Sequence, residues 1–228
     1  MSPSGSLVLF DIDGTLMRGA GQHHREALVE GIRRVTGRLT TLDGVPTSGM
    51  LDRDLITAML RASGEGNSRI QKSLSRIVAE CQSCYAANCA TDLSAFVCVG
   101  VHEALRGLFA RGAKAGLVTG NLSTIGWKKV ELAGLREYFS VGAFAENGRT
   151  RTRLAQIAAQ RARRERLITK DARISLIGDH MNDIQAAKAN GFQAIAVATG
   201  VISLAELKAA KPDILVSNLS ELDLEKLL

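Results

Sequence analysis

Short runs of apolar residues alternate with longer amphipathic stretches along most of this chain. Apolar runs that are rich in β-branched side chains and bounded by glycine or polar residues predict strands, and their nearly continuous apolar character indicates burial on both faces. The main strands are expected at residues 7–11, 115–119, 174–178, 194–197 and 214–216, with a short additional one near 141–144.

The stretches between these strands have helical periodicity, and a glycine follows three of them at the position where helices commonly end. Strands that alternate with helices in this way are typical of a parallel sheet covered by helices on both faces. The predicted fold class is therefore α/β, with a Rossmann-like core. Its helices are expected at residues 101–111, 123–133, 152–166 and 182–190.

The segment 18–98 breaks this alternation. It contains no convincing strand, and its periodicity predicts helices only. A connection of this length is too long for a single crossover between neighbouring strands, so we expect an inserted all-helical domain. The predicted organisation is a core formed by residues 1–17 and 99–228 and a helical cap formed by residues 18–98. The cap helices are expected at residues 24–35, 52–62 and 70–85.

The composition is that of an ordinary globular protein, with 46% hydrophobic and 23% charged residues. The formal net charge of +6 suits anionic small molecules but is too small to indicate a nucleic-acid partner. The arginines within residues 161–166 are not interleaved with aromatic residues, so we expect them to form a solvated helix face. No nucleic-acid partner is therefore expected.

No apolar run approaches the roughly 18 residues that a membrane-spanning helix needs. The first residues also lack the basic region of a signal peptide. We therefore expect no membrane association and a cytoplasmic location.

Four cysteines lie within a short part of the chain, and the first two form a C-x-x-C pair. A zinc site would require further ligands, such as a second C-x-x-C pair or nearby histidines, and the sequence has neither close to this pair. A free cysteine in a helix behaves as a small buried apolar residue. We therefore expect a packing role rather than a metal or disulfide role for Cys81, Cys84, Cys89 and Cys98.

Two carboxylates, Asp11 and Asp13, lie one residue apart where the first strand ends. In open α/β sheets, ligands bind in the crevice outside the carboxyl ends of the strands. Two like charges held close together repel each other, and this raises one of their pKa values unless a cation lies between them. The pair therefore indicates a magnesium site, an acid/base couple, or both.

Polar residues also follow two later strands. Thr119, Gly120 and Asn121 end one of them, and Asp179 and Asp183 follow another. Each has an ordinary structural explanation, because threonine suits a strand-end turn and aspartate suits the N-cap or first turn of a helix. Parallel strands, however, place their ends at one edge of the sheet. That shared edge favours a common site.

These motifs, in this order, resemble those of the haloacid dehalogenase superfamily of hydrolases. The long early helical insert is similar to that of the subgroup with a helical cap, which includes phosphoglycolate phosphatase. The resemblance extends from Leu7 to the apolar run near Ile214. It implies a phosphoric monoester hydrolase that binds Mg²⁺ and acts on a small phosphorylated metabolite.

The resemblance also implies a role for each acidic residue. Asp11 would attack phosphorus and form an aspartyl-phosphate, which divides the hydrolysis into two easier steps. Asp13 would donate a proton to the leaving alcohol and then accept one from water. Mg²⁺ would be held by the carboxylates of Asp11 and Asp179 and the backbone carbonyl of Asp13. Asp183 would not bind the metal directly but would orient a metal-bound water or a basic residue.

The same resemblance places Thr119 and the backbone N–H groups of Gly120 and Asn121 on the oxygens of the transferring phosphoryl group. A cation would neutralise this group.

That cation is lysine in many relatives, but this chain has no lysine between Lys129 and Lys170. An arginine must serve instead, and its planar fork suits phosphate and carboxylate oxygens. The register of the segment selects Arg151, with Arg153 as the alternative and Arg149 as a further candidate.

The cap, residues 18–98, would supply substrate choice and close over the site. Residues 45–53 fit two interpretations, a loop that faces the active site or a plain turn in which Asp52 caps the following helix. His23 and His24 lie where the chain enters the cap, and neither is assigned a function.

Several alternatives stay open at this stage. Asp13 favours phosphoryl transfer over dehalogenation, but a phosphomutase for sugar phosphates would use the same aspartyl-phosphate. A non-catalytic regulatory protein that retains the fold is a further alternative. The sequence does not distinguish a monomer from a dimer, and it does not name the substrate.

Overall fold

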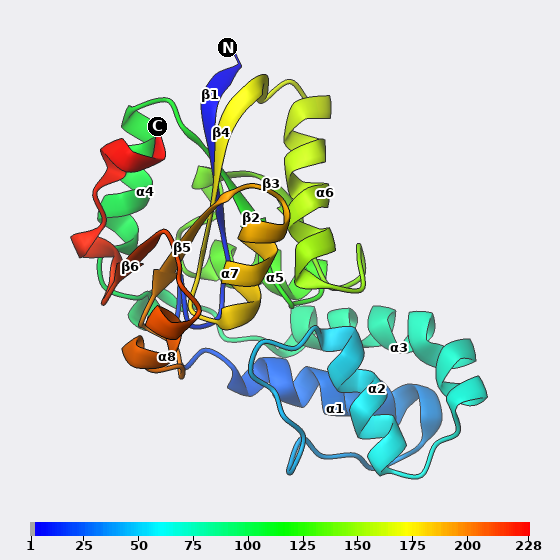
Figure 1. Cartoon of the computed structure of the whole chain (residues 1–228). Coiled ribbons are helices and arrows are strands. Elements are labelled where there is room, and N and C mark those ends of the chain that lie inside the picture. Colours follow the sequence, from blue (N-terminus) through cyan, green and yellow to red (C-terminus); the bar gives the residue numbers. More distant parts are fainter. Residues whose placement is uncertain (1–2) are drawn as a thin grey trace.

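A six-stranded sheet forms the centre of the computed structural model, which describes residues 3–228 (Figure 1). The strand order is β3-β2-β1-β4-β5-β6, and each neighbouring pair is parallel. The predicted α/β class is therefore confirmed. The strands are β1 (Ser4–Phe10), β2 (Lys114–Val118), β3 (Phe139–Ala143), β4 (Ile168–Gly178), β5 (Gln193–Val197) and β6 (Ile214–Val216).

Alternate residues of β1 point into two separate cores, one on each face of the sheet. Leu7 and Leu9 pack in the core that includes Leu154, whereas Val8 and Phe10 pack in the core of the opposite face. This arrangement explains the continuous apolar character of the strand. The helices around the sheet are α4 (Val101–Ala110), α5 (Ser123–Leu132), α6 (Arg151–Arg164), α7 (Met181–Ala189) and α8 (Leu204–Ala209). Short 3₁₀ helices lie at Ser94–Phe96, Arg136–Tyr138, Leu219–Glu221 and Leu224–Leu227.

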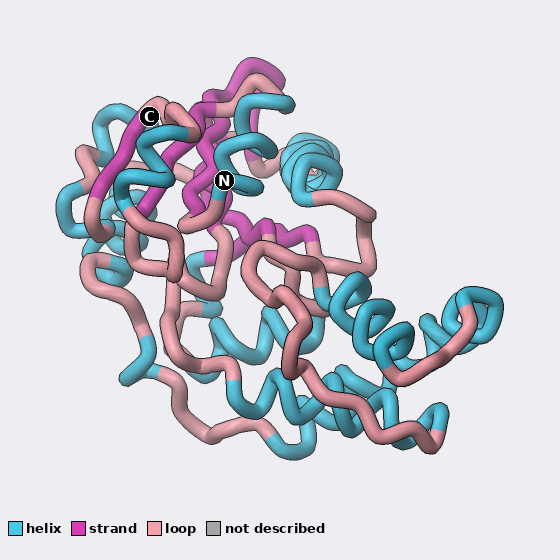
Figure 2. The backbone as a smooth tube through the Cα atoms, turned by 60° about the horizontal axis from the view of Figure 1, so that its bottom comes forward, coloured by secondary structure: helices cyan, strands magenta, loops and turns pink. Residues whose placement is uncertain are grey.

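Three further helices lie beyond the carboxyl ends of the strands, in the lower part of Figure 1. They are α1 (Gln22–Thr36), α2 (Asp52–Ala62) and α3 (Asn67–Asn88). Their apolar faces pack against one another around Ile32, Ile56 and Ile77. Figure 2, with this end turned forward, shows helices and long connecting loops below the strands.

The two connections between this insert and the sheet run side by side. Arg18 N–H donates to the carbonyl of Phe96 at 2.9 Å, and Cys98 N–H donates to the carbonyl of Leu16 at 3.0 Å. The paired segments fall where residues 18–98 are expected to leave and rejoin the core. The division into residues 1–17 with 99–228 and a cap of 18–98 stays a prediction.

The largest difference from the predicted elements is in β4, which begins six positions before the expected residue 174, at Ile168. Its first half is partly exposed and polar, so it gives no apolar run to read. Helices α1 and α3 also extend beyond their predicted ends, whereas α2 covers the expected residues 52–62. Asp52 does not cap α2: the N-cap is Leu51, and no side chain bonds to the first turn.

Two of the four cysteines have the packing role expected of them, whereas Cys89 and Cys98 are only partly buried. Cys81 and Cys84 are buried on α3, and all four thiols are free. The Cys81 thiol donates to the carbonyl of Leu28 at 3.7 Å, and burial raises its pKa to about 12. Within residues 3–228, none of the helices combines the length and hydropathy that a membrane crossing needs.

Candidate active site

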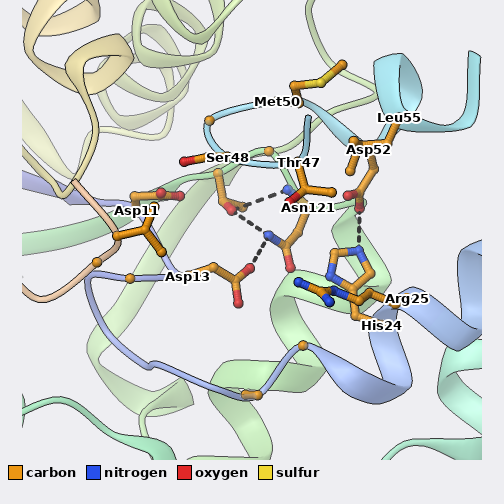
Figure 3. Close-up of a pocket in the computed structure, with 18 of the residues that line it drawn as sticks. Asp11, Asp13, His24, Arg25, Thr47, Ser48, Met50, Asp52, Leu55 and Asn121 are labelled. Atoms are coloured by element: carbon orange, nitrogen blue, oxygen red, sulfur yellow. Dashed lines mark hydrogen bonds and ion pairs between the residues drawn. The ribbon is translucent and has the colours of Figure 1, made fainter. Parts of the chain in front are cut away.

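The carboxyl ends of β1, β2 and β4 lie side by side at one edge of the sheet. This edge opens into a cavity of about 660 Å³ that is also lined by the helical insert. In Figure 3, Asp11 and Asp13 lie on one side of the cavity. His24 and Arg25 lie on the other side, with Asn121 between. The predicted site residues that line the cavity are Asp11, Asp13, Thr119, Gly120, Asn121, Arg151 and Asp179.

Three of the predicted acidic residues form a buried carboxylate cluster. Asp11, Asp179 and Asp183 each offer an oxygen that lies within 4.8 Å of the others. Asp183 is in the first turn of α7, where its Oδ2 accepts a hydrogen bond from His180 N–H at 3.3 Å. His180, not Asp179, is the N-cap of this helix. Asp183 therefore caps the helix and also belongs to the cluster.

Two glycines and a hydroxyl fix the position of Asp179. A Cβ atom on Gly14 would lie 2.2 Å from Asp179 Oδ2, and one on Gly200 would lie 1.7 Å from the same atom. Gly14 also has a φ of +90°, which other residues rarely adopt. The hydroxyl of Thr15 donates to Asp179 Oδ1 at 3.1 Å. The turn after β1 is therefore shaped to receive the carboxylate that follows β4.

Arg151, the first residue of α6, is buried beside the carboxylate cluster. Its Nη1 donates to Asp11 Oδ1 at 2.9 Å and to the carbonyl of Val118 at 3.0 Å, and its Nε lies 3.2 Å from Asp183 Oδ1. The two other candidate arginines, Arg149 and Arg153, are exposed. The structure thus brings Arg151 to the site.

One guanidinium does not balance three carboxylates in this buried environment. Burial raises the pKa of Asp179 to about 7, and the Asp11 carboxylate adds to the rise. Burial also raises the pKa of Asp183 well above its usual range, although Arg151 opposes this rise. For Arg151, burial lowers the pKa, but Asp11 and Asp183 raise it more. Arg151 alone therefore does not stabilise all three carboxylates in their ionised forms, and a further cation would be needed for that.

The carboxylate cluster fits a divalent cation. Its donors are hard oxygens, which Mg²⁺ prefers. Asp183 Oδ1 is buried and accepts no hydrogen bond, although it lies near Arg151 Nε. A cation would supply the missing positive charge. The carboxylate of Asp13 is not part of this cluster. Its expected contribution, a backbone carbonyl, stays a prediction.

The loop after β2 is packed closely against the helical insert. Thr119 is fully buried, and its Oγ1 accepts hydrogen bonds from Asn121 N–H at 3.3 Å and Asn121 Nδ2 at 2.9 Å. A Cβ atom on Gly120 would lie 2.4 Å from the carbonyl oxygen of Met50, so only glycine allows this approach. The Gly120 carbonyl in turn accepts a hydrogen bond from Asp52 N–H at 2.8 Å. Of the two interpretations of residues 45–53, this packing favours the loop that faces the site.

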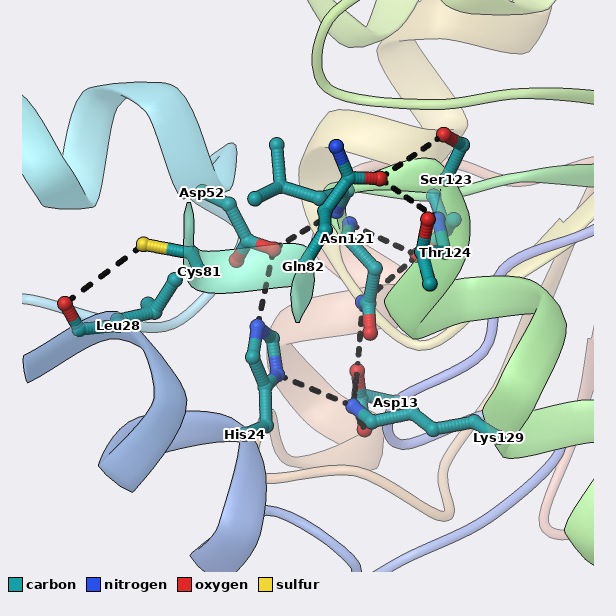
Figure 4. Close-up of polar contacts among 12 residues, drawn as sticks. Asp13, His24, Leu28, Asp52, Cys81, Gln82, Asn121, Ser123, Thr124 and Lys129 are labelled. Atoms are coloured by element: carbon teal, nitrogen blue, oxygen red, sulfur yellow. Dashed lines mark hydrogen bonds and ion pairs between the residues drawn. The ribbon is translucent and has the colours of Figure 1, made fainter. Parts of the chain in front are cut away.

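Asp13 is bound by two donors from the core. Lys129 Nζ lies 2.8 Å from Asp13 Oδ1 and 2.7 Å from Oδ2, and Asn121 Nδ2 donates to Oδ2 at 2.7 Å (Figure 4). Burial opposes the ionisation of Asp13, but Lys129 and His24 lower its pKa overall. Lys129 therefore favours the ionised form of Asp13, which can accept a proton and must take one up before it can donate one.

Lys129, His24 and Asp52 are polar residues of the site that sequence reasoning did not find. Lys129 Nζ lies 3.2 Å from His24 Nδ1, and His24 Nε2 lies 2.9 Å from Asp52 Oδ2. The sequence holds one signal for Lys129, because it follows the buried Ile125 by four residues and so lies on the apolar face of α5. No local pattern predicts the contact between His24 and Asp52, since the two lie on different helices.

The comparisons with known proteins agree with the fold and the motifs. A family model described as haloacid dehalogenase-like hydrolase matches residues 6–191. No curated protein matches the chain.

Solved structures share the whole architecture at low sequence identity. A predicted phosphatase from Clostridium acetobutylicum is 20% identical, with a TM-score of 0.67 and 95% of each chain covered. A β-phosphoglucomutase from Clostridium difficile is 16% identical, with a TM-score of 0.70 over 97% of this chain and 94% of the other. A predicted phosphoglycolate phosphatase from Haemophilus somnus is 17% identical, with a TM-score of 0.64 and 95% of each chain covered.

Identities this low show a shared fold and carry no statement about substrate. The family model, in contrast, spans the chain from β1 to the end of α7 and includes the motifs at the ends of β1, β2 and β4. The chain therefore belongs to the haloacid dehalogenase-like hydrolases.

Proposed function

We propose that this protein is a magnesium-dependent phosphatase that hydrolyses a small phosphorylated metabolite through an aspartyl-phosphate. The observation that carries this proposal is the convergence of Asp11, Asp179 and Asp183 beside Arg151, next to the cavity that Asp11, Asp179 and Arg151 line. An anionic nucleophile can approach an anionic phosphate only where positive charge offsets their repulsion. The site offers a nucleophile, a guanidinium and a set of metal ligands within one small volume.

In the first step, Asp11 attacks phosphorus while the bond from phosphorus to the ester oxygen breaks. Asp13, which has first taken up a proton from solvent, donates it to that oxygen, and the alcohol leaves. Arg151 and the Thr119 hydroxyl stabilise the charge on the phosphoryl oxygens. In the second step, Asp13 removes a proton from water, the water oxygen attacks phosphorus, and the bond to Asp11 breaks. Phosphate leaves and Asp11 is restored.

The cation would be held by Asp11 and Asp179, with the backbone carbonyl of Asp13, and Asp183 would keep Arg151 and the ligands in position. When bound, Mg²⁺ would neutralise charge on the nucleophile and on the phosphate.

We assign substrate choice to the helical insert, because it supplies many of the residues that line the cavity beyond those proposed to bind the phosphoryl group. Arg25 of α1 and the loop from Thr47 to Asp52 line the remaining wall. Arg25 and this loop would contact the part of the substrate beyond the ester oxygen. Closure of the helical insert over the cavity would exclude water from the reacting atoms.

A panel of phosphomonoesters tests this proposal, assayed for free phosphate with Mg²⁺ and with EDTA. We expect Mg²⁺-dependent release by the wild type and a loss of about 10⁴-fold or more in Asp11→Asn, which removes the nucleophile. Interconversion of sugar phosphate isomers without net phosphate release would assign the site to a phosphomutase. Wild-type activity no greater than that of Asp11→Asn across the panel would favour a non-catalytic protein.

A further inference from the structure

The ammonium group of Lys129 is fully buried, which is rare for a lysine without a task that requires it. An ammonium has three donors and no acceptor, and each unpaired donor in the interior costs free energy. Lys129 finds partners in both oxygens of Asp13 and in Nδ1 of His24. The lysine is therefore satisfied only while Asp13 and His24 keep their present positions.

Lys129 and Asp13 differ sharply in their exposure. The Lys129 side chain has an exposed fraction of 0%, whereas 42% of the Asp13 side chain is exposed. Asp13 also lines the cavity. The lysine thus approaches the carboxylate from the protein interior and leaves its other side open to a bound molecule. An ion pair needed only for stability would not require one member to face the cavity.

The contacts continue from Lys129 into the helical insert. If Lys129 donates to His24 Nδ1, then Nε2 carries the ring proton and donates to Asp52 Oδ2 at 2.9 Å. Asp52 Oδ2 also accepts a hydrogen bond from Leu122 N–H at 2.8 Å, which ties it to the loop after β2. His24 belongs to α1 and Asp52 to α2. The position of Lys129 therefore depends on two helices that lie outside the sheet.

We propose that Lys129 is a positioning residue that aims the Asp13 carboxylate at the ester oxygen, and that His24 and Asp52 hold Lys129 in place. The proposal rests on the phosphatase function above. It makes α1 and α2 part of the proton-transfer apparatus, in addition to any contact they make with substrate. Proton transfer requires a group held within hydrogen-bond reach of its target, so a loss of aim slows the step that uses the proton.

The leaving group of the substrate separates this role from a general structural one. An alkoxide must be protonated as it departs, whereas 4-nitrophenolate leaves with little help from an acid. The quantity to compare is kcat/KM, which covers the steps up to the release of the alcohol. We expect Lys129→Met to lower kcat/KM by about 10²-fold for the fastest alkyl phosphate of the panel and by less than about tenfold for 4-nitrophenyl phosphate.

Lys128→Met is the matched control, because Lys128 is the adjacent residue of α5 and its ion pair with Glu131 lies at the surface. In this variant, kcat/KM should lie within about twofold of the wild-type value for both substrates. Equal losses on the two substrates in Lys129→Met, or no loss on either, would overturn the proposal.

His24 provides the second test, and it decides the matter if Lys129→Met does not fold. His24→Asn keeps an acceptor near the position of Nδ1, whereas His24→Leu removes it. We expect His24→Leu to lose more alkyl than aryl activity and His24→Asn to recover part of the difference. Identical behaviour of the two variants would contradict the proposal. A wild type without phosphatase activity would instead refute the proposed function itself.

Discussion

The two ionic groups of the cavity are balanced in opposite ways. Beside Arg151, three carboxylates share one guanidinium, and the pKa values of Asp179 and Asp183 are raised. Beside Lys129, the single carboxylate of Asp13 accepts hydrogen bonds from an ammonium and an amide, and its pKa is lowered. The first group lacks positive charge, whereas the second is complete with protein groups alone.

This difference separates two carboxylates that lie only two residues apart in the sequence. Asp11 lies where additional positive charge would stabilise it, whereas the carboxylate of Asp13 is held in one direction by Lys129 and Asn121. Under the proposed function, the same short motif would serve two chemical tasks, because its side chains meet different neighbours. Removal of a carboxylate charge should therefore change the free energy of unfolding in opposite directions, with a decrease at Asp13 and an increase at Asp179.

The largest effect is expected for Arg151→Ala, which removes the only guanidinium that contacts Asp11 among the described residues. Turnover should fall by about 10²–10³-fold, because a donor to the phosphoryl oxygens is lost. Steady-state kinetics on the best substrate of the panel measures this. Arg153→Ala is the matched control, since Arg153 is exposed two residues further along α6. A larger loss in Arg153→Ala than in Arg151→Ala would transfer the role to Arg153.

Asp13→Asn should destabilise the protein, because the amide leaves the buried Lys129 ammonium without a counter-charge. We expect a decrease of about 1–3 kcal/mol in the free energy of unfolding, less than for a fully buried pair because the Asp13 side chain is 42% exposed. Urea denaturation measures the change. The double variant Asp13→Asn with Lys129→Met should recover most of the loss, and the absence of recovery would show that the ion pair is not its cause.

Asp179→Asn should have the opposite effect in metal-free protein. The pKa of Asp179 is raised from 3.8 to about 7, so the folded state binds its proton more tightly than the unfolded state does. Stability should therefore decrease as the pH rises from about 4 to about 8. Asp179→Asn removes this loss and should be more stable than the wild type by about 1–2 kcal/mol at pH 8, with little difference near pH 4. Denaturation in EDTA at both values checks the sign.

Residues that follow apolar strands were predictable, because the parallel arrangement alone brings strand ends to one edge. Asp11, Thr119 and Asp179 line one cavity for this reason. Arg151 required an additional inference from register. Its burial at the first position of α6, with exposed arginines two residues away on either side, is a feature of the folded chain.

The contacts between the insert and the core were not predictable from the sequence. Lys129 lies on the apolar face of α5, but a lysine is usually predicted to be exposed whatever its position in the helical pattern. His24 and Asp52 become part of the site only when α1 and α2 dock beside the strand ends. Periodicity describes each helix separately and contains no information on how two helices meet.

The most direct test of the magnesium-dependent site is the binding of Mg²⁺ itself, measured by isothermal titration calorimetry on the wild type and on Asp179→Asn. We expect the wild type to bind Mg²⁺ and Asp179→Asn to bind it at least about 100-fold more weakly, because a buried carboxylate ligand is lost. Equal binding by the two proteins, or no binding by the wild type, would contradict the assignment of the carboxylate cluster as a metal site.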